Sequence, residues 1–132
     1  MLAQVARNDA AGTPTVFLAW EPHPMNLNFE ITYLTGGDEE FGPNFGSASI
    51  HTLARKEWVA ECPNAARLFT QLVFETEMEN QLIADILDNG TDPRDAAKEW
   101  IAANPQVLDT WLDGVTTLDG QPGADAMRAS LN

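Results

Sequence analysis

The pattern of hydrophobic and polar residues changes from strand-like to helix-like near the middle of the chain. Residues Thr15 to Trp20 form a short apolar, partly β-branched run between two prolines, which predicts a strand buried on both faces. From Leu27 to Leu34 apolar and polar residues alternate, which predicts a half-buried strand. A Gly-rich acidic loop at 36–46 then precedes a third expected strand at Ser49 to Arg55.

The second half carries apolar residues at helical spacing, with typical start and stop residues between the segments. Pro63 can begin the first helix, and Thr76 followed by Glu79 fits a capping box that begins the second. Gly90 should end that second helix. Three more helices are expected after Asp92-Pro93, after Asn104-Pro105 and in the tail from Ala124 to Leu131. A few strands followed by several short helices predict an α/β unit, whose small sheet would need partners from elsewhere.

Length and charge narrow the classes of function. The 132 residues are enough for one domain or for part of a larger one. The formal net charge of −13 argues against nucleic acid and against an anionic membrane surface, since both require clustered Lys and Arg. A cationic ligand suits this charge better, although salt screens the attraction at a distance.

Cysteine content and hydropathy narrow the possible functions only slightly. The single cysteine, Cys62, excludes an internal disulfide and is expected to be a small buried apolar residue. No run reaches the about 18 apolar residues that suggest a membrane-spanning helix, so direct membrane insertion is not expected. Residues 1–13 lack the basic and apolar regions of a signal peptide, so an export signal is expected on an upstream part.

The densest candidate site is the segment that follows the first expected strand. Trp20, Glu21 and His23 lie there between prolines, and ligands of open α/β sheets bind beyond the carboxyl ends of strands. An indole face attracts a desolvated cation by about 2 kcal/mol or more, and aromatic cages use this attraction for methylated ammonium groups. His23 could donate to a carboxylate or hydroxyl at the other end of such a ligand.

Simpler structural roles compete with this interpretation. Trp20 could be a plain core tryptophan, His23 a loop residue that binds a carbonyl, and Glu21 a solvated charge. His51 is expected to be a structural histidine within a strand. No metal-ligand spacing, nucleophile elbow or phosphate loop is present in the sequence, so neither a metal nor a cofactor is expected.

Four segments resemble one known family. VFLAWEPHPMNLNFEITYL, SIHTLARKEW, PRDAAKEWIAANPQVLDTWLDG and TTLDGQPG occur in this order between residues 14 and 123. They are similar to segments of the glycine betaine, choline and proline-betaine binding proteins of ABC importers, and the last is most like the choline-binding branch. The resemblance implies a two-lobed periplasmic-binding-protein-like fold that binds quaternary ammonium compounds and has no enzymatic activity.

The resemblance also implies an arrangement and a set of partners. Residues 14–24 would form a strand and ligand turn of one lobe, 25–50 a crossing segment, and 51–132 the mainly helical part of the other lobe. Trp20 would be one wall of the cage, His23 the histidine of the turn, and Glu21 their neighbour. An ABC permease and an extracytoplasmic location are implied. Family members are about twice as long, so this chain is expected to be a fragment, or to pair with a separate chain that supplies the missing N-terminal half or with a copy of itself.

Two other functions compete with the transport hypothesis. A half-length unit would expose apolar surface, which favours a self-associating structural or interaction module without a small-molecule ligand. A small hydrolase is the weakest alternative, because the sequence offers no nucleophile and base that can be paired.

Overall fold

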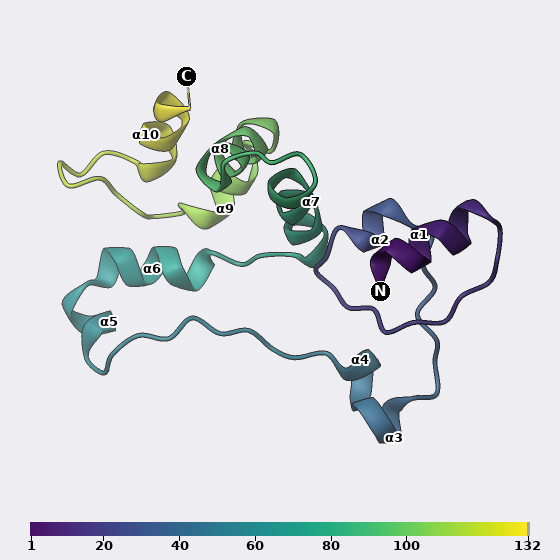
Figure 1. The fold of residues 1–132 in the computed structure, drawn as a ribbon. Coiled ribbons are helices and arrows are strands. Elements are labelled where there is room, and N and C mark those ends of the chain that lie inside the picture. The colour runs from purple at the N-terminus through teal and green to yellow at the C-terminus, as the bar shows by residue number, and fades with distance from the viewer. Residues whose placement is uncertain (132) are drawn as a thin grey trace. The chain divides into compact units, whose positions relative to one another are not determined.

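The computed structural model describes residues 1–131, and helices are the regular structure of this part (Figure 1). Loops and extended segments connect these helices. Their bounds are α1 (Leu2–Ala10), α2 (Met25–Asn28), α3 (Asp38–Phe41), α4 (Pro43–Gly46), α5 (Trp58–Glu61), α6 (Pro63–Gln71), α7 (Thr76–Leu87), α8 (Pro93–Ala103), α9 (Val107–Trp111) and α10 (Gly123–Ser130).

The helices expected in the second half are confirmed. Pro63 is the first residue of α6, as its position predicts. The carboxylate of Asp92 accepts a 2.9 Å hydrogen bond from the Arg94 N–H and so caps α8. Gly90 has a φ of +72°, a conformation that glycine adopts without strain, and it follows the end of α7.

The three expected strands are wrong as regular structure. Within residues 1–131 the only β pairing is an isolated bridge between Thr116 and Pro122. Met25–Asn28 is helical, so the predicted strand from Leu27 loses its first two residues, and the Gly-rich loop contains α3 and α4. The remaining residues of the three segments are irregular (Figure 1). A strand requires a neighbour for its backbone N–H and C=O groups, and the described chain supplies none.

The first of two compact units comprises residues 1–50 and 76–90. It contains α1 to α4 and α7, and α2 packs against α7. Its buried side chains include Val5, Met25, Met78 and Asn80. The sequence assigns 51–132 to one lobe, whereas α7 belongs here to the unit that contains Trp20; the assignment to lobes stays a prediction.

The second compact unit comprises residues 51–75 and 91–132. Its core includes Ala66 of α6, Ala96 of α8, and Leu108 and Trp111 of α9. The Trp111 indole stacks on Trp100 with ring centroids 6.2 Å apart. The tryptophans of α8 and α9 therefore stabilise this unit.

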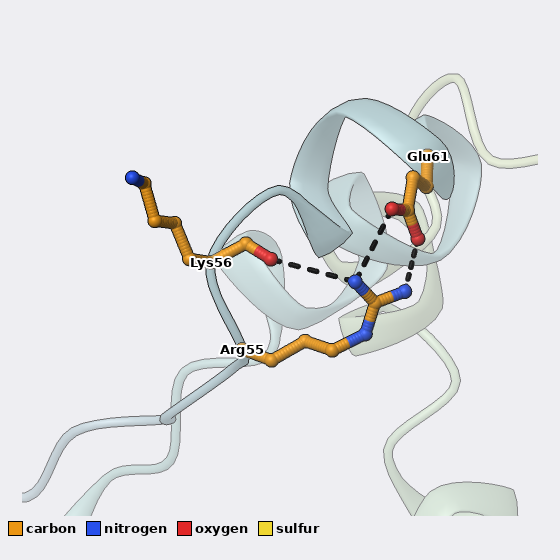
Figure 2. A network of polar contacts seen from close by, with 3 residues as sticks. All are labelled: Arg55, Lys56 and Glu61. Carbon is orange, nitrogen blue, oxygen red and sulfur yellow. Dashed lines mark hydrogen bonds and ion pairs between the residues drawn. The ribbon is translucent and has the colours of Figure 1, made fainter.

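An exposed ion pair lies where the third extended segment reaches α5 (Figure 2). The guanidinium of Arg55 donates to both carboxylate oxygens of Glu61, and its Nη1 also lies 3.4 Å from the Lys56 carbonyl. The hydrogen bond that Arg55 donates to Glu61 raises the pKa of the Arg55 guanidinium. Exposed pairs contribute little stability, so this contact mainly orients the chain before α5.

Other sequence expectations concern single residues and membrane crossing. Cys62 is a free thiol and only partly buried, and His51 is exposed on an extended segment. The expectation of a histidine packed within a strand is therefore wrong, because no strand forms around it. Among the described residues, no helix has the length and apolar character needed to cross a membrane.

Candidate functional site

The candidate site is the aromatic turn, defined here as residues Trp20 to Met25. It connects the extended segment that ends at Trp20 with α2, and its Glu21–Pro22 peptide bond is cis. Trp20 is 47% exposed. Its indole is therefore a surface group of the first unit and not a core tryptophan.

Trp20 and His23 are in ring contact. Their centroids are 5.0 Å apart and their planes meet at 74°, which is an edge-to-face arrangement. Such contacts are favourable because the positive edge of one ring meets the negative face of the other. The contact holds the two side chains of the turn together on one side of the first unit.

The hydrogen bonds of His23 define which ring nitrogen carries its proton. The Nδ1 atom accepts a 3.1 Å hydrogen bond from the backbone N–H of Met25. In the neutral imidazole the other nitrogen must then carry the hydrogen. His23 can therefore offer an Nε2–H donor to a ligand while its Nδ1 holds the start of α2.

Asn26 binds both ends of the turn. Its Nδ2 donates to the carbonyl of Trp20 at 2.9 Å and to that of His23 at 3.0 Å. Its Oδ1 accepts a hydrogen bond of 3.0 Å from the hydroxyl of Tyr33. Asparagine side chains commonly stabilise turns by bonding to nearby backbone groups, and here one side chain closes the turn and connects it to residue 33.

Helix α7 anchors the turn from a distant part of the sequence. The Oδ1 of Asn80, a side chain only 3% exposed, accepts a 2.7 Å hydrogen bond from the His23 N–H. At the end of α2, the Nδ2 of Asn28 donates a 2.8 Å hydrogen bond to the carboxylate of Asp88, the residue after α7. Pro24 and Met25 between them are fully buried. The position of His23 therefore depends on both packing and a buried polar contact.

We expect replacement of Asn80 to disturb the turn more than replacement of the exposed Asn28. The Asn80→Ala variant should lose about 1–3 kcal/mol in the free energy of unfolding, because the partly buried His23 N–H loses its acceptor. Asn28→Ala, which breaks an exposed bond from α2 to Asp88, the residue after α7, should cost less than about 1 kcal/mol. Urea unfolding measures both values, and equal losses would contradict the anchoring role of Asn80.

The Glu21 carboxylate acts electrostatically on the Tyr33 phenol. Partial burial raises the pKa of the Tyr33 phenol, and the nearby Glu21 carboxylate raises it further. Tyr33 also contacts the ring of Phe45, with centroids 6.0 Å apart. Glu21 is itself exposed, so the aromatic turn carries a negative charge that is accessible to solvent.

Tyr33 is the only tyrosine of the chain, so its ionisation can be followed by ultraviolet absorbance. We expect a midpoint above the ordinary value of 10.0 in the folded protein, and a lower midpoint in Glu21→Gln. The pKa of Tyr33 is raised in the folded state, so the protonated phenol contributes to the free energy of unfolding. This contribution is complete below the unfolded-state pKa and is lost as the pH rises through the folded-state pKa. The control is Glu30→Gln, which removes a carboxylate from the segment that carries Tyr33. An unchanged midpoint in Glu21→Gln would contradict the proximity of the two groups.

A cavity of about 800 Å³ lies beside the turn in the first unit. Residues 12–19 and 29–34 line it, together with Val5 of α1 and residues of α3 and α4. Trp20, Glu21 and His23 do not belong to its lining. Among residues 1–131, no three His, Cys, Asp or Glu side chains are placed to hold a metal ion.

Residues 1–103 match the family model for the substrate-binding domain of ABC-type glycine betaine transport systems. The chain belongs to this family. The resemblance found in the sequence is thereby confirmed.

A curated relative and two solved structures agree with this family. The chain is 32% identical over 107 residues to the glycine betaine/carnitine transport binding protein GbuC of Listeria monocytogenes, a match that covers 81% of this chain and 34% of that protein. It is 51% identical to an ABC-transporter choline binding protein solved with choline, with a TM-score of 0.78 and coverage of 99% of this chain and 45% of the other. The unliganded semi-closed form gives a TM-score of 0.71 and covers 46% of that chain.

These matches place the chain within a known fold and also show its extent. The structural similarity shows that this chain forms part of the substrate-binding-protein fold. The regular structure of its described residues is nevertheless helical. The chain spans about a third of the curated relative and less than half of the solved choline-binding chain. The relatives are transport proteins, not enzymes.

The sequence indicated Trp20, Glu21 and His23 as site residues, and the structure brings these three together in one turn. Sequence reasoning missed Asn26, Tyr33 and Asn80. Asn26 could have been noticed as a turn residue that follows two prolines. Asn80 had no such signal, because it lies between Glu79 and Gln81 in a polar stretch of the sequence.

Proposed function

We propose that this chain provides one wall of a binding site for a small quaternary ammonium compound, such as choline or glycine betaine. Trp20 is the wall, His23 orients the polar end of the ligand, and Glu21 contributes negative charge. The site serves an extracytoplasmic substrate-binding protein that delivers its ligand to an ABC permease. Binding and release of the solute, without chemical conversion, is the proposed activity.

The half-exposed indole of Trp20, fixed against His23, is the observation that carries this proposal. A trimethylammonium group has no N–H to donate, so π faces and shape must replace hydrogen bonds in its recognition. The Nε2–H of His23 then suits an acceptor at the far end of the ligand, such as a carboxylate or a hydroxyl. The two side chains supply complementary halves of recognition from one short turn.

The names of the relatives support the same ligand class. One is a glycine betaine/carnitine transport binding protein, and the solved choline binding protein was determined with choline. Glycine betaine, carnitine and choline all carry a trimethylammonium group. The shared chemistry therefore favours a cation–π site, while the second end of the ligand differs between a carboxylate and a hydroxyl.

The energetics require walls beyond this chain. A single aromatic contact with a cation contributes about 0.5–2 kcal/mol, whereas micromolar affinity corresponds to about 8 kcal/mol. The remaining contacts are expected from the part of the protein that the relatives have in addition. The functional binding protein in this proposal is therefore a complex or a longer chain that includes these 132 residues.

Calorimetric titration tests the proposal. The chain is combined with the segment of the choline-binding relative that it does not match, and choline, glycine betaine and trimethylamine oxide are titrated into the complex. We expect saturable binding of at least one of the three. Absence of heat at millimolar concentrations, with the complex intact, would overturn the proposed function.

A further inference from the structure

An Asn-Gly pair that the candidate site does not use lies just beyond the end of α7. Asn89 and Gly90 follow shortly after Leu87, the last residue of this helix, and both are exposed. No other asparagine of the chain is followed by glycine. Because glycine has no side chain, it leaves the peptide nitrogen of such a pair unshielded. The Asn89 side chain and the adjoining backbone can therefore react with each other.

The local structure leaves both reacting groups accessible. Gly90 has a φ of +72°, and no atom lies within 4 Å of the position that a β-carbon would take there. Within residues 1–131, no backbone carbonyl accepts a hydrogen bond from the Gly90 N–H. The Nδ2 of Asn89 donates an exposed 2.9 Å hydrogen bond to Asp85, a type of contact with a small net stabilisation. Neither the carboxamide nor the nitrogen is protected by burial.

We propose that Asn89 is a site of spontaneous deamidation, in which the Gly90 nitrogen displaces the side-chain amide. Hydroxide removes the Gly90 N–H proton, and the nitrogen forms a bond to the Cγ of Asn89. The Cγ–Nδ2 bond breaks, and Nδ2 takes a proton from water and leaves as ammonia. A water molecule then opens the cyclic imide at one of its two carbonyls. Attack at Cγ gives aspartate, and attack at the backbone carbonyl gives isoaspartate.

Two other asparagines show what protects a side-chain amide from this reaction. Asn104 precedes Pro105, whose nitrogen carries no hydrogen and cannot form the imide. Asn80 is only 3% exposed, lies within α7 and accepts a hydrogen bond from the His23 N–H. Both therefore serve as internal references for Asn89 within the same chain.

Deamidation places a second carboxylate beside Asp85. Residues 85 and 89 are already in contact, and like charges four positions apart destabilise a helix. The new charge also lies near the C-terminal end of α7, where the helix dipole disfavours negative charge. We therefore expect the 2.8 Å hydrogen bond from the Asp88 N–H to the Ala84 carbonyl to open more often. The end of α7 that binds Asn28 of α2 would be loosened.

Peptide mass spectrometry of the aged protein tests the proposal. The folded 132-residue chain is incubated at mildly alkaline pH and digested with trypsin, which gives a peptide of residues 68–94 that contains both Asn80 and Asn89. We expect Asn89 to deamidate at least about tenfold faster than Asn80, because an exposed helix end opens more readily than a buried helical position. Labelling with an isoaspartate methyltransferase identifies the isoaspartate product.

Substitutions at the pair identify the reacting groups. Asn89→Gln keeps the carboxamide but moves it away from the nitrogen by one methylene, so its deamidation should be at least about tenfold slower. Gly90→Ala shields the nitrogen and should also slow the reaction, although a φ of +72° strains alanine. Thr91→Ala leaves the pair intact and should deamidate at the original rate.

The expected product can be examined separately. Asn89→Asp introduces the carboxylate directly, and the Asp88 amide should exchange with deuterium at least about threefold faster in this variant than in Asn89→Gln. Equal exchange in the two variants would contradict the loosening of α7.

Two results would overturn the deamidation site itself. One is equal reactivity of Asn80 and Asn89 in the folded chain. The other is an Asn89 that stays intact in the folded chain but deamidates in urea, since the fold would then protect the pair. Neither result depends on ligand binding, so this inference stands or falls independently of the proposed function.

Discussion

Replacing Trp20 by alanine should weaken the binding of choline or glycine betaine at least about tenfold in the complex that contains this chain. The expected loss follows from the cation–π contact, since about 1.4 kcal/mol corresponds to a factor of ten and one indole contributes up to about 2 kcal/mol. Because Trp20 is 47% exposed, its removal leaves no large cavity in the first unit. The effect should therefore appear in affinity and hardly in stability, as measured by calorimetry and urea unfolding.

Two further variants separate the role of the ring from general perturbation. Trp20→Phe keeps a π face of weaker potential and should retain part of the affinity. Trp58→Ala removes a partly exposed tryptophan from the second unit, where Trp58 contacts Phe69 at 5.6 Å, and should leave the affinity nearly unchanged. Full affinity in Trp20→Ala would show that the indole is not a wall of the site.

The candidate site could be predicted from the sequence because its residues are close together in the chain. Trp20, Glu21 and His23 lie within four positions, and Pro22 and Pro24 predicted a loop at the end of an apolar run. The hydrogen bond between the His23 N–H and Asn80 joins positions 57 residues apart. No local pattern indicates such a contact, because it depends on how α2 packs against α7.

The helices of the second half from α6 onward could be predicted from the sequence, whereas the predicted strands did not form. Each helix satisfies most of its own backbone hydrogen bonds, so local signals such as Pro63, Asp92 and Gly90 were sufficient to place it. A strand depends on a partner, which can be remote in the sequence or on another chain. The run from Thr15 to Trp20 has the composition of a strand and remains extended, and what it lacks is a neighbour.

The Trp111→Ala variant should lower the free energy of unfolding of the second unit by about 3–5 kcal/mol. This is the usual cost of truncating a buried aromatic residue. Trp111 is buried, and its ring contacts Phe74 edge to face at 5.7 Å and Trp100 in a stacked arrangement. Its indole N–H also donates to the Val73 carbonyl at 3.2 Å. Urea unfolding followed by circular dichroism measures the loss.

The choice of substitution distinguishes packing from hydrogen bonding at Trp111. Trp111→Phe preserves an aromatic ring but leaves the Val73 carbonyl without its donor, so an intermediate loss is expected. Trp58→Ala again serves as the matched control, because Trp58 is only partly buried and should cost less than Trp111. Equal losses for Trp58→Ala and Trp111→Ala would mean that α9 is not the centre of this core. A large loss confined to Trp111 would show that the second unit has a core of its own, built around the tryptophans of α8 and α9.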